Sequence, residues 1–255
     1  MPKFESYAQG TPCYAELITS DLAAAKEFYA DLLGWTYDSP PEMEAVYASA
    51  RVQGDRVAGL MLPPDGSAVP QAHWRVYLDV DDVDAATAKA ESAGGTVTTA
   101  PFDVMTLGRA ATIVDPTGAE ISLWQPRDII GTERANEPGT PCWNELLTTD
   151  LDAAAAFYTA VLGVEWEQQD MGGEPYWLLK SEGRPVAGAM VPAQQMPAQW
   201  SVYLNVDDVD ATVARAEELG GKQLMPAFDV PGVGRLGILV DPQGAMFALM
   251  ADTAS

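Results

Sequence analysis

The sequence is a tandem duplication, and this repeat constrains the fold more than any other feature of the chain. Residues 10–35 are identical to residues 139–164 at 15 of 26 positions. Residues 73–95 are identical to residues 199–221 at 15 of 23 positions. Agreement at this level within one chain of 255 residues indicates two copies of one unit, so we predict that the two halves share one fold.

The domain boundaries follow from the place where the repeat begins again. We predict a first domain at residues 1–129 and a second domain at residues 139–255. The segment between them, residues 130–138, combines charged residues with Gly131 and Pro138 and is expected to be the linker. A domain of about 120 residues is long enough to bury a hydrophobic core of its own.

Each half contains a second, shorter repeat. An aspartate stands 13 residues before a glycine at four places, in the pairs Asp21–Gly34, Asp82–Gly95, Asp150–Gly163 and Asp208–Gly221. Aspartate is a favoured N-terminal cap of a helix, and glycine is the favoured residue just after its end. Each pair therefore predicts a helix of about three turns. A strand precedes each helix and short β-rich runs follow it, so we predict a strand–helix–three-strand module that occurs four times.

The strand before each predicted helix alternates in residue type. In the second module, Trp74, Val76 and Leu78 form an apolar face that suits packing against helices. The opposite face of the same strand carries Arg75 and Tyr77. A sheet with helices on one side and polar and aromatic residues on the other is typical of a curved sheet that holds a ligand.

Three motifs occur once in each half, at matching places in the repeat. They are DLAAAKEFYADLLGW and DLDAAAAFYTAVLGV near the starts, VDDVDAA and VDDVDAT in the middles, and VDPTGAEISLW and VDPQGAMFALM near the ends. With these motifs the chain resembles the vicinal oxygen chelate superfamily, which contains glyoxalase I, bleomycin-resistance proteins and extradiol dioxygenases. It is most similar to the two-domain actinobacterial members that are labelled glyoxalase-like or hydroxylase.

The resemblance implies a fold class and a place for the ligand. The fold is α+β, and each domain joins two βαβββ modules into one cupped mixed sheet with the helices outside. The ligand then lies in the cup. We call the concave face of the first domain's sheet the first cup and that of the second domain's sheet the second cup.

The superfamily holds a divalent metal with His, Glu or Gln side chains from four strands. The resemblance places three of these positions at Tyr14, Arg75 and Ser122 in the first cup and at Trp143, Ser201 and Ala248 in the second. The fourth falls in Val57–Leu62 or Val186–Val191, which offer only Val, Ala, Gly, Leu and Met. Neither group is a competent set of metal ligands. The chain contains one histidine, which excludes a site with two histidines and one carboxylate. We therefore predict no catalytic metal and no other cofactor.

Two glutamates are the candidate catalytic residues. Glu16 and Glu145 occupy the same place on the cup-facing strands of the two domains. A carboxyl group in a partly dry pocket has a raised pKa and could act as a general acid or base. The alternative is that an ion pair or hydrogen bonds neutralise each glutamate. Arg75 is the expected partner of Glu16, whereas the equivalent neighbour of Glu145 is Ser201.

Aromatic and polar residues on the cup faces are the candidate ligand-binding residues. In the first cup they are Tyr14, Arg75, Tyr77, Glu120, Ser122 and Trp124. In the second cup they are Trp143, Trp177, Ser201 and Tyr203. Aromatic rings could stack on a flat ligand, or they could close the cup by packing together. The polar mixture of the first cup favours it as the site, since Met246 and Met250 indicate packing or an apolar ligand in the second.

The charge of the chain limits its partners. Fourteen basic residues against 37 acidic residues give a formal net charge of −23, which repels a nucleic-acid backbone. The charge could attract a cationic ligand, or it could simply keep the protein in solution. The N-terminus lacks a basic region followed by an apolar region, and no apolar run approaches the length of a membrane span. We expect a soluble, cytoplasmic monomer or homodimer without a membrane or nucleic-acid partner.

Two functions from different classes are consistent with these features. The first is a metal-free protein that binds a small aromatic or cationic molecule in a cup, in the manner of the bleomycin-resistance proteins. The second is a metal-independent enzyme, such as a lyase, isomerase or hydroxylase, that acts on a natural product or carbonyl metabolite through Glu16 or Glu145.

Overall fold

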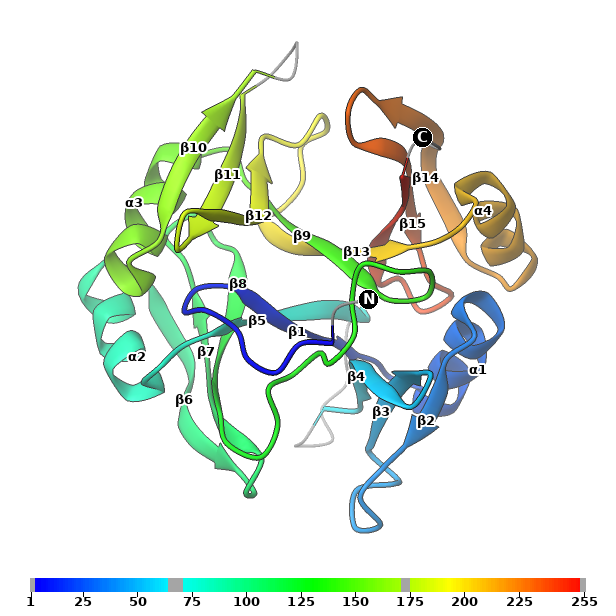
Figure 1. The fold of residues 1–255 in the computed structure, drawn as a ribbon, viewed down its shortest axis with the longest axis horizontal. Helices are drawn as coiled ribbons and strands as arrows, with labels where there is room; N and C mark the ends of the chain where they lie inside the picture. The colour runs from blue at the N-terminus through cyan, green and yellow to red at the C-terminus, as the bar shows by residue number, and fades with distance from the viewer. Residues whose placement is uncertain (1–2, 64–70, 171–174, 253–255) are drawn as a thin grey trace.

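The structure, a computed structural model, describes residues 3–63, 71–170 and 175–252, and these form two similar domains (Figure 1). The first domain contains β1 (Pro12–Ile18), α1 (Leu22–Leu33), β2 (Thr36–Asp38), β3 (Tyr47–Val52), β4 (Asp55–Met61), β5 (His73–Asp79), α2 (Val83–Ser92), β6 (Thr96–Val104), β7 (Gly108–Val114) and β8 (Glu120–Pro126). The second contains β9 (Pro141–Leu147), α3 (Leu151–Leu162), β10 (Glu165–Gln169), β11 (Tyr176–Ser181), β12 (Arg184–Met190), β13 (Gln199–Asn205), α4 (Val209–Glu218), β14 (Lys222–Val230), β15 (Gly234–Val240) and β16 (Met246–Asp252).

Each domain has one eight-stranded mixed sheet, in which two modules lie side by side. The strand order of the first sheet is β2-β3-β4-β1-β5-β8-β7-β6, and that of the second is β10-β11-β12-β9-β13-β16-β15-β14. The modules join at the antiparallel pairs β1–β5 and β9–β13, and each joining strand runs parallel to the last strand of its own module. The α+β fold with four βαβββ modules is therefore confirmed.

Within the described residues, each of the four helices is capped at its N-terminus by the predicted aspartate. The carboxylate of Asp21 accepts a hydrogen bond from the backbone N–H of Ala24 at 3.0 Å. The carboxylates of the other three caps accept the equivalent bond, from the residue three positions further on: Asp82, Asp150 and Asp208. The spacing from aspartate to glycine was thus a reliable guide to where each helix starts.

The helix ends agree with the prediction in two of the four modules. α1 and α3 end at glycines in the left-handed conformation, Gly34 and Gly163. The predicted ends of α2 and α4 at Gly95 and Gly221 are wrong by one residue, because the left-handed glycines there are Gly94 and Gly220. Two glycines are adjacent at each of these helix ends, and the sequence pattern does not show which of the two ends the helix.

Two hydrophobic cores hold the molecule together, and each is built from both domains. The first core packs Leu17 and Phe28 of the β1–β4 module together with Phe247 of the β13–β16 module. The second core packs Ile121 of the β5–β8 module together with Phe157 of the β9–β12 module. As a result α1 lies beside α4, and α2 lies beside α3 (Figure 1). The helices lie outside the cups, as predicted, and each belongs to a core that the two domains share.

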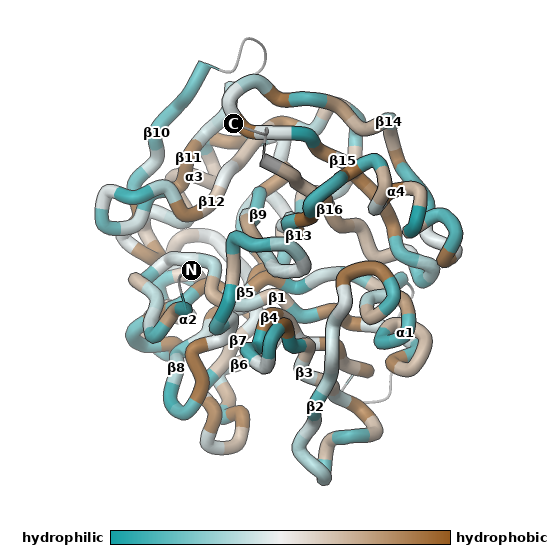
Figure 2. Tube along the Cα trace, turned by 45° about the vertical axis from the view of Figure 1, so that its right-hand side comes forward, coloured by the Kyte–Doolittle hydropathy of each residue, from teal (hydrophilic) through white to brown (hydrophobic). Residues whose placement is uncertain are grey.

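Two edge strands are poor templates for pairing with another chain. β2 has three residues, and β10 has the sequence EWEQQ and is hydrophilic along most of its length (Figure 2). Short or charged edge strands discourage edge-to-edge association of sheets. Among the described helices, none is long and apolar enough to cross a membrane.

A buried hydrogen-bond chain crosses the domain interface beside each core. In the first core the Trp74 indole N–H donates to the Tyr29 hydroxyl, which donates to Asp241 Oδ2, both at 3.2 Å. In the second core the corresponding bonds run from Trp200 to Tyr158 at 2.8 Å and from Tyr158 to Asp115 at 3.0 Å. Both aspartates come from the DPxG turns, so each turn binds a helix of the other domain.

We expect the Tyr29→Phe variant to lower the free energy of unfolding by about 1–3 kcal/mol, since it leaves the Trp74 N–H and one Asp241 oxygen buried without their partner. Urea unfolding followed by circular dichroism measures this change. The matched control is Tyr37→Phe, because the buried Tyr37 hydroxyl has no hydrogen-bond partner among the described residues. Equal losses in both variants would contradict a stabilising role for the interdomain chain.

Candidate functional site

A glutamate and a tyrosine form the same hydrogen-bonded pair in both cups. The Tyr77 hydroxyl donates to Glu16 Oε2 at 2.8 Å, and the Tyr203 hydroxyl donates to Glu145 Oε2 at 2.5 Å. Both glutamates are buried, with 6% and 4% of their surface exposed. Burial raises the pKa of each carboxyl, and the tyrosine hydrogen bond opposes the increase.

Arg75 is not the hydrogen-bond partner of Glu16 that the sequence led us to expect. Arg75 lies opposite Glu16 in the sheet register, yet its Nε donates to Glu120 Oε1 at 3.2 Å, towards solvent. The hydrogen bond to Glu16 comes instead from Tyr77, two residues further along β5. Arg75 still acts on Glu16 through its charge, which lowers the pKa of that carboxyl.

The other predicted residues of the first cup bind mainly to one another. Tyr14 shares a hydroxyl–hydroxyl bond with Tyr47 at 2.8 Å, and Ser122 shares one with Thr112 at 2.9 Å. Trp124 packs edge-on against the ring of Tyr77, with ring centroids 6.4 Å apart. These contacts satisfy the polar groups that were candidates for ligand binding.

The segment that follows the last strand of the first sheet packs against the aromatic residues of the first cup. Ile129 and Tyr7 pack in one hydrophobic cluster with Tyr14, Tyr77 and Trp124. The Trp124 indole N–H donates to the carbonyl of Ile129 at 3.2 Å. Ile129, the last residue of the first domain, is therefore part of the packing of the first cup.

The second cup contains a cavity of about 500 Å³. Glu145 forms its polar end with Tyr203 and Tyr176 beside it, Gln169 is a further polar residue of the lining, and most of the remaining surface is apolar. The apolar and aromatic residues that line it are Trp143, Leu178, Met190, Phe228, Val230, Val233, Leu236 and Met250. We therefore place the candidate site in the second cup, although the sequence favoured the first.

Tyr176 completes the polar end of this cavity. Its hydroxyl lies near Glu145 and lowers the pKa of that carboxyl, and it accepts a hydrogen bond from the Trp143 indole N–H at 3.0 Å. A Cβ atom at Gly188 would collide with the Tyr176 hydroxyl oxygen, so this glycine is required for Tyr176 to reach its position. Glu145 thus faces the cavity with two phenol groups beside it.

The structure brings together only some of the predicted residues of the second cup. Glu145, Trp143 and Tyr203 line the cavity. Ser201 is buried opposite Glu145 in the register and does not line it. The placement of Trp177 in the cup is wrong, since its ring packs on the helix side, against the second core.

Sequence reasoning missed Tyr176 for the same reason, because it assigned the wrong face of β11 to the cup. Residues 176 and 178 of β11 face the cavity, so residue 177 faces the helices. The signal that could have found it is the repeat, because Tyr47 and Tyr176 occupy equivalent places opposite Met61 and Met190.

The residues of the cups do not fit a divalent metal. At the positions that the resemblance assigns to metal ligands, the second cup has Trp143, Ser201 and Ala248. Within the described residues, no group of three His, Cys, Asp or Glu side chains is placed to hold a metal ion. Metal-free function stays a prediction that measurement must test.

Residues 12–123 match the model of the Glyoxalase/Bleomycin resistance protein/Dioxygenase superfamily, and residues 144–250 match that of the Glyoxalase-like domain. The chain belongs to this superfamily. It is 43% identical to "Putative glyoxylase CFP32" of Mycobacterium tuberculosis over 98% of both chains. It is 37% identical to "Anthracycline biosynthesis protein DnrV" of Streptomyces peucetius, over 96% of this chain and 94% of that one.

Solved structures of the superfamily share the fold. The Mn(II)-bound glyoxalase from Novosphingobium aromaticivorans superposes with a TM-score of 0.68 at 19% identity, covering 96% of this chain and 83% of that one. The 2,3-dioxygenase LapB from a Pseudomonas species superposes with a TM-score of 0.67 at 14% identity, covering 97% and 94%. At 19% and 14% identity, these two structures show only that the two-domain fold is shared.

We expect the Glu145→Gln variant to gain stability over the unchanged protein as the pH rises. The pKa of Glu145 is raised in the folded state, so the unfolded chain ionises first, and folding becomes less favourable from about pH 4.3 upwards through the raised pKa. Below that range both states are protonated and the two proteins should differ little. Urea unfolding from pH 4 to pH 8 measures the difference.

The control for this titration is Glu44→Gln, which changes an exposed glutamate. A surface substitution of this kind is expected to alter stability by less than about 0.5 kcal/mol at every pH. A stability difference for Glu145→Gln that shrinks with rising pH would contradict the raised pKa.

Proposed function

We propose that the second cup binds a flat, largely apolar organic molecule, without a catalytic metal, and that a carbonyl or hydroxyl oxygen of this molecule lies against Glu145. The observation that carries the proposal is the cavity of about 500 Å³, apolar except at the end that holds Glu145. Ligand sites are commonly apolar pockets with a few convergent polar groups.

The polar end suits an oxygen-bearing ligand in either protonation state of Glu145. A neutral carboxyl can donate its proton in a hydrogen bond to a carbonyl oxygen, whereas a carboxylate can accept a bond from a hydroxyl. The rings of Trp143 and Phe228 supply apolar surface for a flat ligand. Glu16 is less suited to this role because the charge of Arg75 acts on it.

The names of the relatives support a small organic ligand that contains oxygen. Two relatives are named for anthracycline biosynthesis, and two are named as putative glyoxylases. Anthracyclines are flat ring systems with carbonyl and hydroxyl oxygens, which are the groups that Glu145 can bind.

Acid–base catalysis is the second candidate function, and the buried state of Glu145 favours it. In this reaction the Glu145 carboxylate would take a proton from the carbon next to a carbonyl group. The C–H electron pair would move to form an enolate, and Glu145 would return the proton to the same or a neighbouring carbon. A carboxyl with a raised pKa is suited to both steps at neutral pH.

We expect 2-acetylnaphthalene, a flat aromatic ketone, to bind in the second cup. Phe228→Ala should weaken its binding about tenfold, as expected for the loss of about 1.4 kcal/mol of ring contact. The matched control is Phe102→Ala, since Phe102 is the repeat equivalent of Phe228 in the first domain. Isothermal titration calorimetry before and after dialysis against EDTA measures both effects. Equal weakening by both variants, or binding that requires added metal, would overturn the proposal.

Deuterium exchange separates binding from catalysis. In D₂O, an acid–base enzyme exchanges the methyl protons beside the ketone faster than buffer does, and Glu145→Gln removes this exchange while the dissociation constant changes little. A binding protein leaves exchange at the buffer rate. Mass spectrometry of the recovered ketone decides between the two functions.

A further inference from the structure

A groove of about 630 Å³ lies between the two domains, where β5 and β13 begin. The first residues of β5 and β8, His73 and Glu120, line it from the first domain. The first residues of β13 and β16, Gln199 and Met246, line it from the second. We propose that this groove binds an α-amino acid with a large apolar side chain. Among the described residues, none lines both the groove and the cavity of the second cup, so the two are separate sites.

The first domain supplies a charged pair to the groove. The Arg75 Nε–H group donates to Glu120 Oε1 at 3.2 Å, and both side chains are partly exposed, Arg75 by 22% and Glu120 by 41%. A guanidinium has five N–H groups, so donors remain after this bond even with the Tyr77 hydroxyl nearby. Among the described residues, Arg75 alone donates to the Glu120 carboxylate. Each member of the pair can therefore bind a further group of opposite charge.

The second domain supplies an apolar side to the groove. Met196, Leu224 and Met246 line it. Leu224 is 50% exposed, and a ligand in the groove would remove part of this apolar surface from water. Its equivalent in the first domain is the polar residue Thr98. Methionine side chains are flexible and pack against apolar groups of many shapes. This side of the groove therefore suits an apolar side chain.

The repeat shows that the fold does not require the difference between the two sides. Glu120 corresponds to Met246, and Arg75 corresponds to Ser201, which is buried in the second sheet. Both copies form the same sheet, so the sheet does not depend on an ion pair at these positions. The consequence of the difference is a groove with one charged side and one apolar side. A groove of this kind is suited to an amphipathic molecule.

The charged pair matches both charges of an α-amino acid. The ligand carboxylate would accept hydrogen bonds from Arg75, and the ligand ammonium would donate to Glu120. A ligand with a carboxylate alone would be repelled by Glu120 and by the formal net charge of −23, and a ligand with an amine alone would be repelled by Arg75. An amino acid therefore fits the charged side better than an ion of either sign, and its side chain would lie against Met246.

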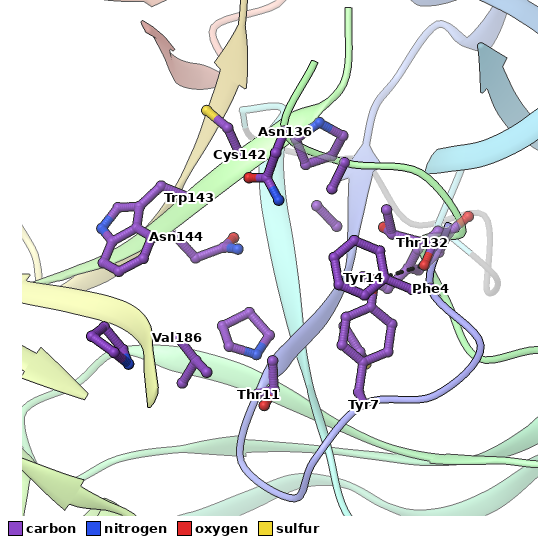
Figure 3. Close-up of a pocket in the computed structure, with 16 residues that line it drawn as sticks. Phe4, Tyr7, Thr11, Tyr14, Thr132, Asn136, Cys142, Trp143, Asn144 and Val186 are labelled. Carbon is purple, nitrogen blue, oxygen red and sulfur yellow. Dashed lines mark hydrogen bonds between the residues drawn. The ribbon is translucent and has the colours of Figure 1, made fainter. Parts of the chain in front are cut away.

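The interdomain pocket between β1 and β9 has a different lining (Figure 3). Its volume is about 360 Å³, and none of the described residues that line it is charged. The Tyr7 hydroxyl there donates to the carbonyl of Thr132 at 2.6 Å (Figure 3). A charged ligand in this pocket would lose its hydration without gaining an opposite charge nearby. The groove that contains Arg75 and Glu120, and not this pocket, therefore suits an amino acid.

The test uses His73, which lines the groove and is the single histidine of the chain, so its imidazole NMR signal needs no assignment. We expect L-phenylalanine to shift this signal saturably in the full-length protein at constant pH. The analogues 3-phenylpropionate, without the amine, and 2-phenylethylamine, without the carboxylate, should bind at least about tenfold more weakly, because each lacks one charge-assisted hydrogen bond. General attraction by the negative charge of the protein would instead favour the amine.

Two substitutions assign the ligand's charges to the pair. Glu120→Gln should remove the preference for L-phenylalanine over 3-phenylpropionate. Arg75→Ser, which introduces the residue of the second domain, should remove the preference over 2-phenylethylamine. The matched control is Glu167→Gln, which changes an exposed glutamate that pairs with Lys180 at 2.8 Å and does not line the groove. This control should leave both preferences unchanged.

The proposal is overturned if the His73 signal shows no saturable shift, or if either analogue binds as tightly as L-phenylalanine. Preferences that survive Glu120→Gln and Arg75→Ser would also overturn it. The comparison of the three ligands requires no substitution, so it decides the matter even where a variant folds poorly.

Discussion

The reciprocal hydrogen bonds between the domains are the constraint on which the rest of the structure depends. Tyr29 of the first domain donates to Asp241 of the second, and Tyr158 of the second donates to Asp115 of the first. The other oxygen of each aspartate accepts backbone N–H groups of its own turn. One carboxylate thus shapes the turn before the last strand of its sheet and also holds a helix of the other domain. Because the duplication supplies this interaction twice, each domain holds a helix of the other.

This arrangement leaves the cups free to differ. Side chains alternate between the two faces of a strand, so the residues that join the domains and those that line the cups occupy different positions. The first cup contains Glu16 under the influence of Arg75 and is packed against Ile129. The second cup has Ser201 where the first has Arg75, and it encloses a cavity. The same glutamate–tyrosine pair therefore lies in two different environments.

The helices and the four modules could be predicted because they depend on local signals and on the repeat, whereas the joining of two modules into one cupped sheet was implied by the family resemblance. The spacing from Asp21 to Gly34 specifies a capped helix within a single segment, and the fourfold repeat of that spacing specifies the modules. The sequence did not show which cup contains the cavity. Ile129 packs against the aromatic residues of the first cup after the chain leaves the first sheet, and no local signal predicts that contact. Trp177 was misplaced because the sequence of β11 contains aromatic residues on both faces, Tyr176 and Trp177, and alternation alone does not show which one faces the cup.

Comparison of the two copies identifies the hydrogen-bond partners of Glu16 and Glu145 better than charge complementarity does. Charge complementarity suggested Arg75 for Glu16, yet the bond is made by Tyr77, and the equivalent Tyr203 binds Glu145. Only the tyrosine is present in both copies, whereas the arginine is replaced by Ser201. A contact that both cups share belongs to the common scaffold, and a residue that differs between them marks where their chemistry differs. By this criterion the tyrosine–glutamate pair is inherited structure, and the replacement of Arg75 by Ser201 leaves the second carboxyl without that positive charge.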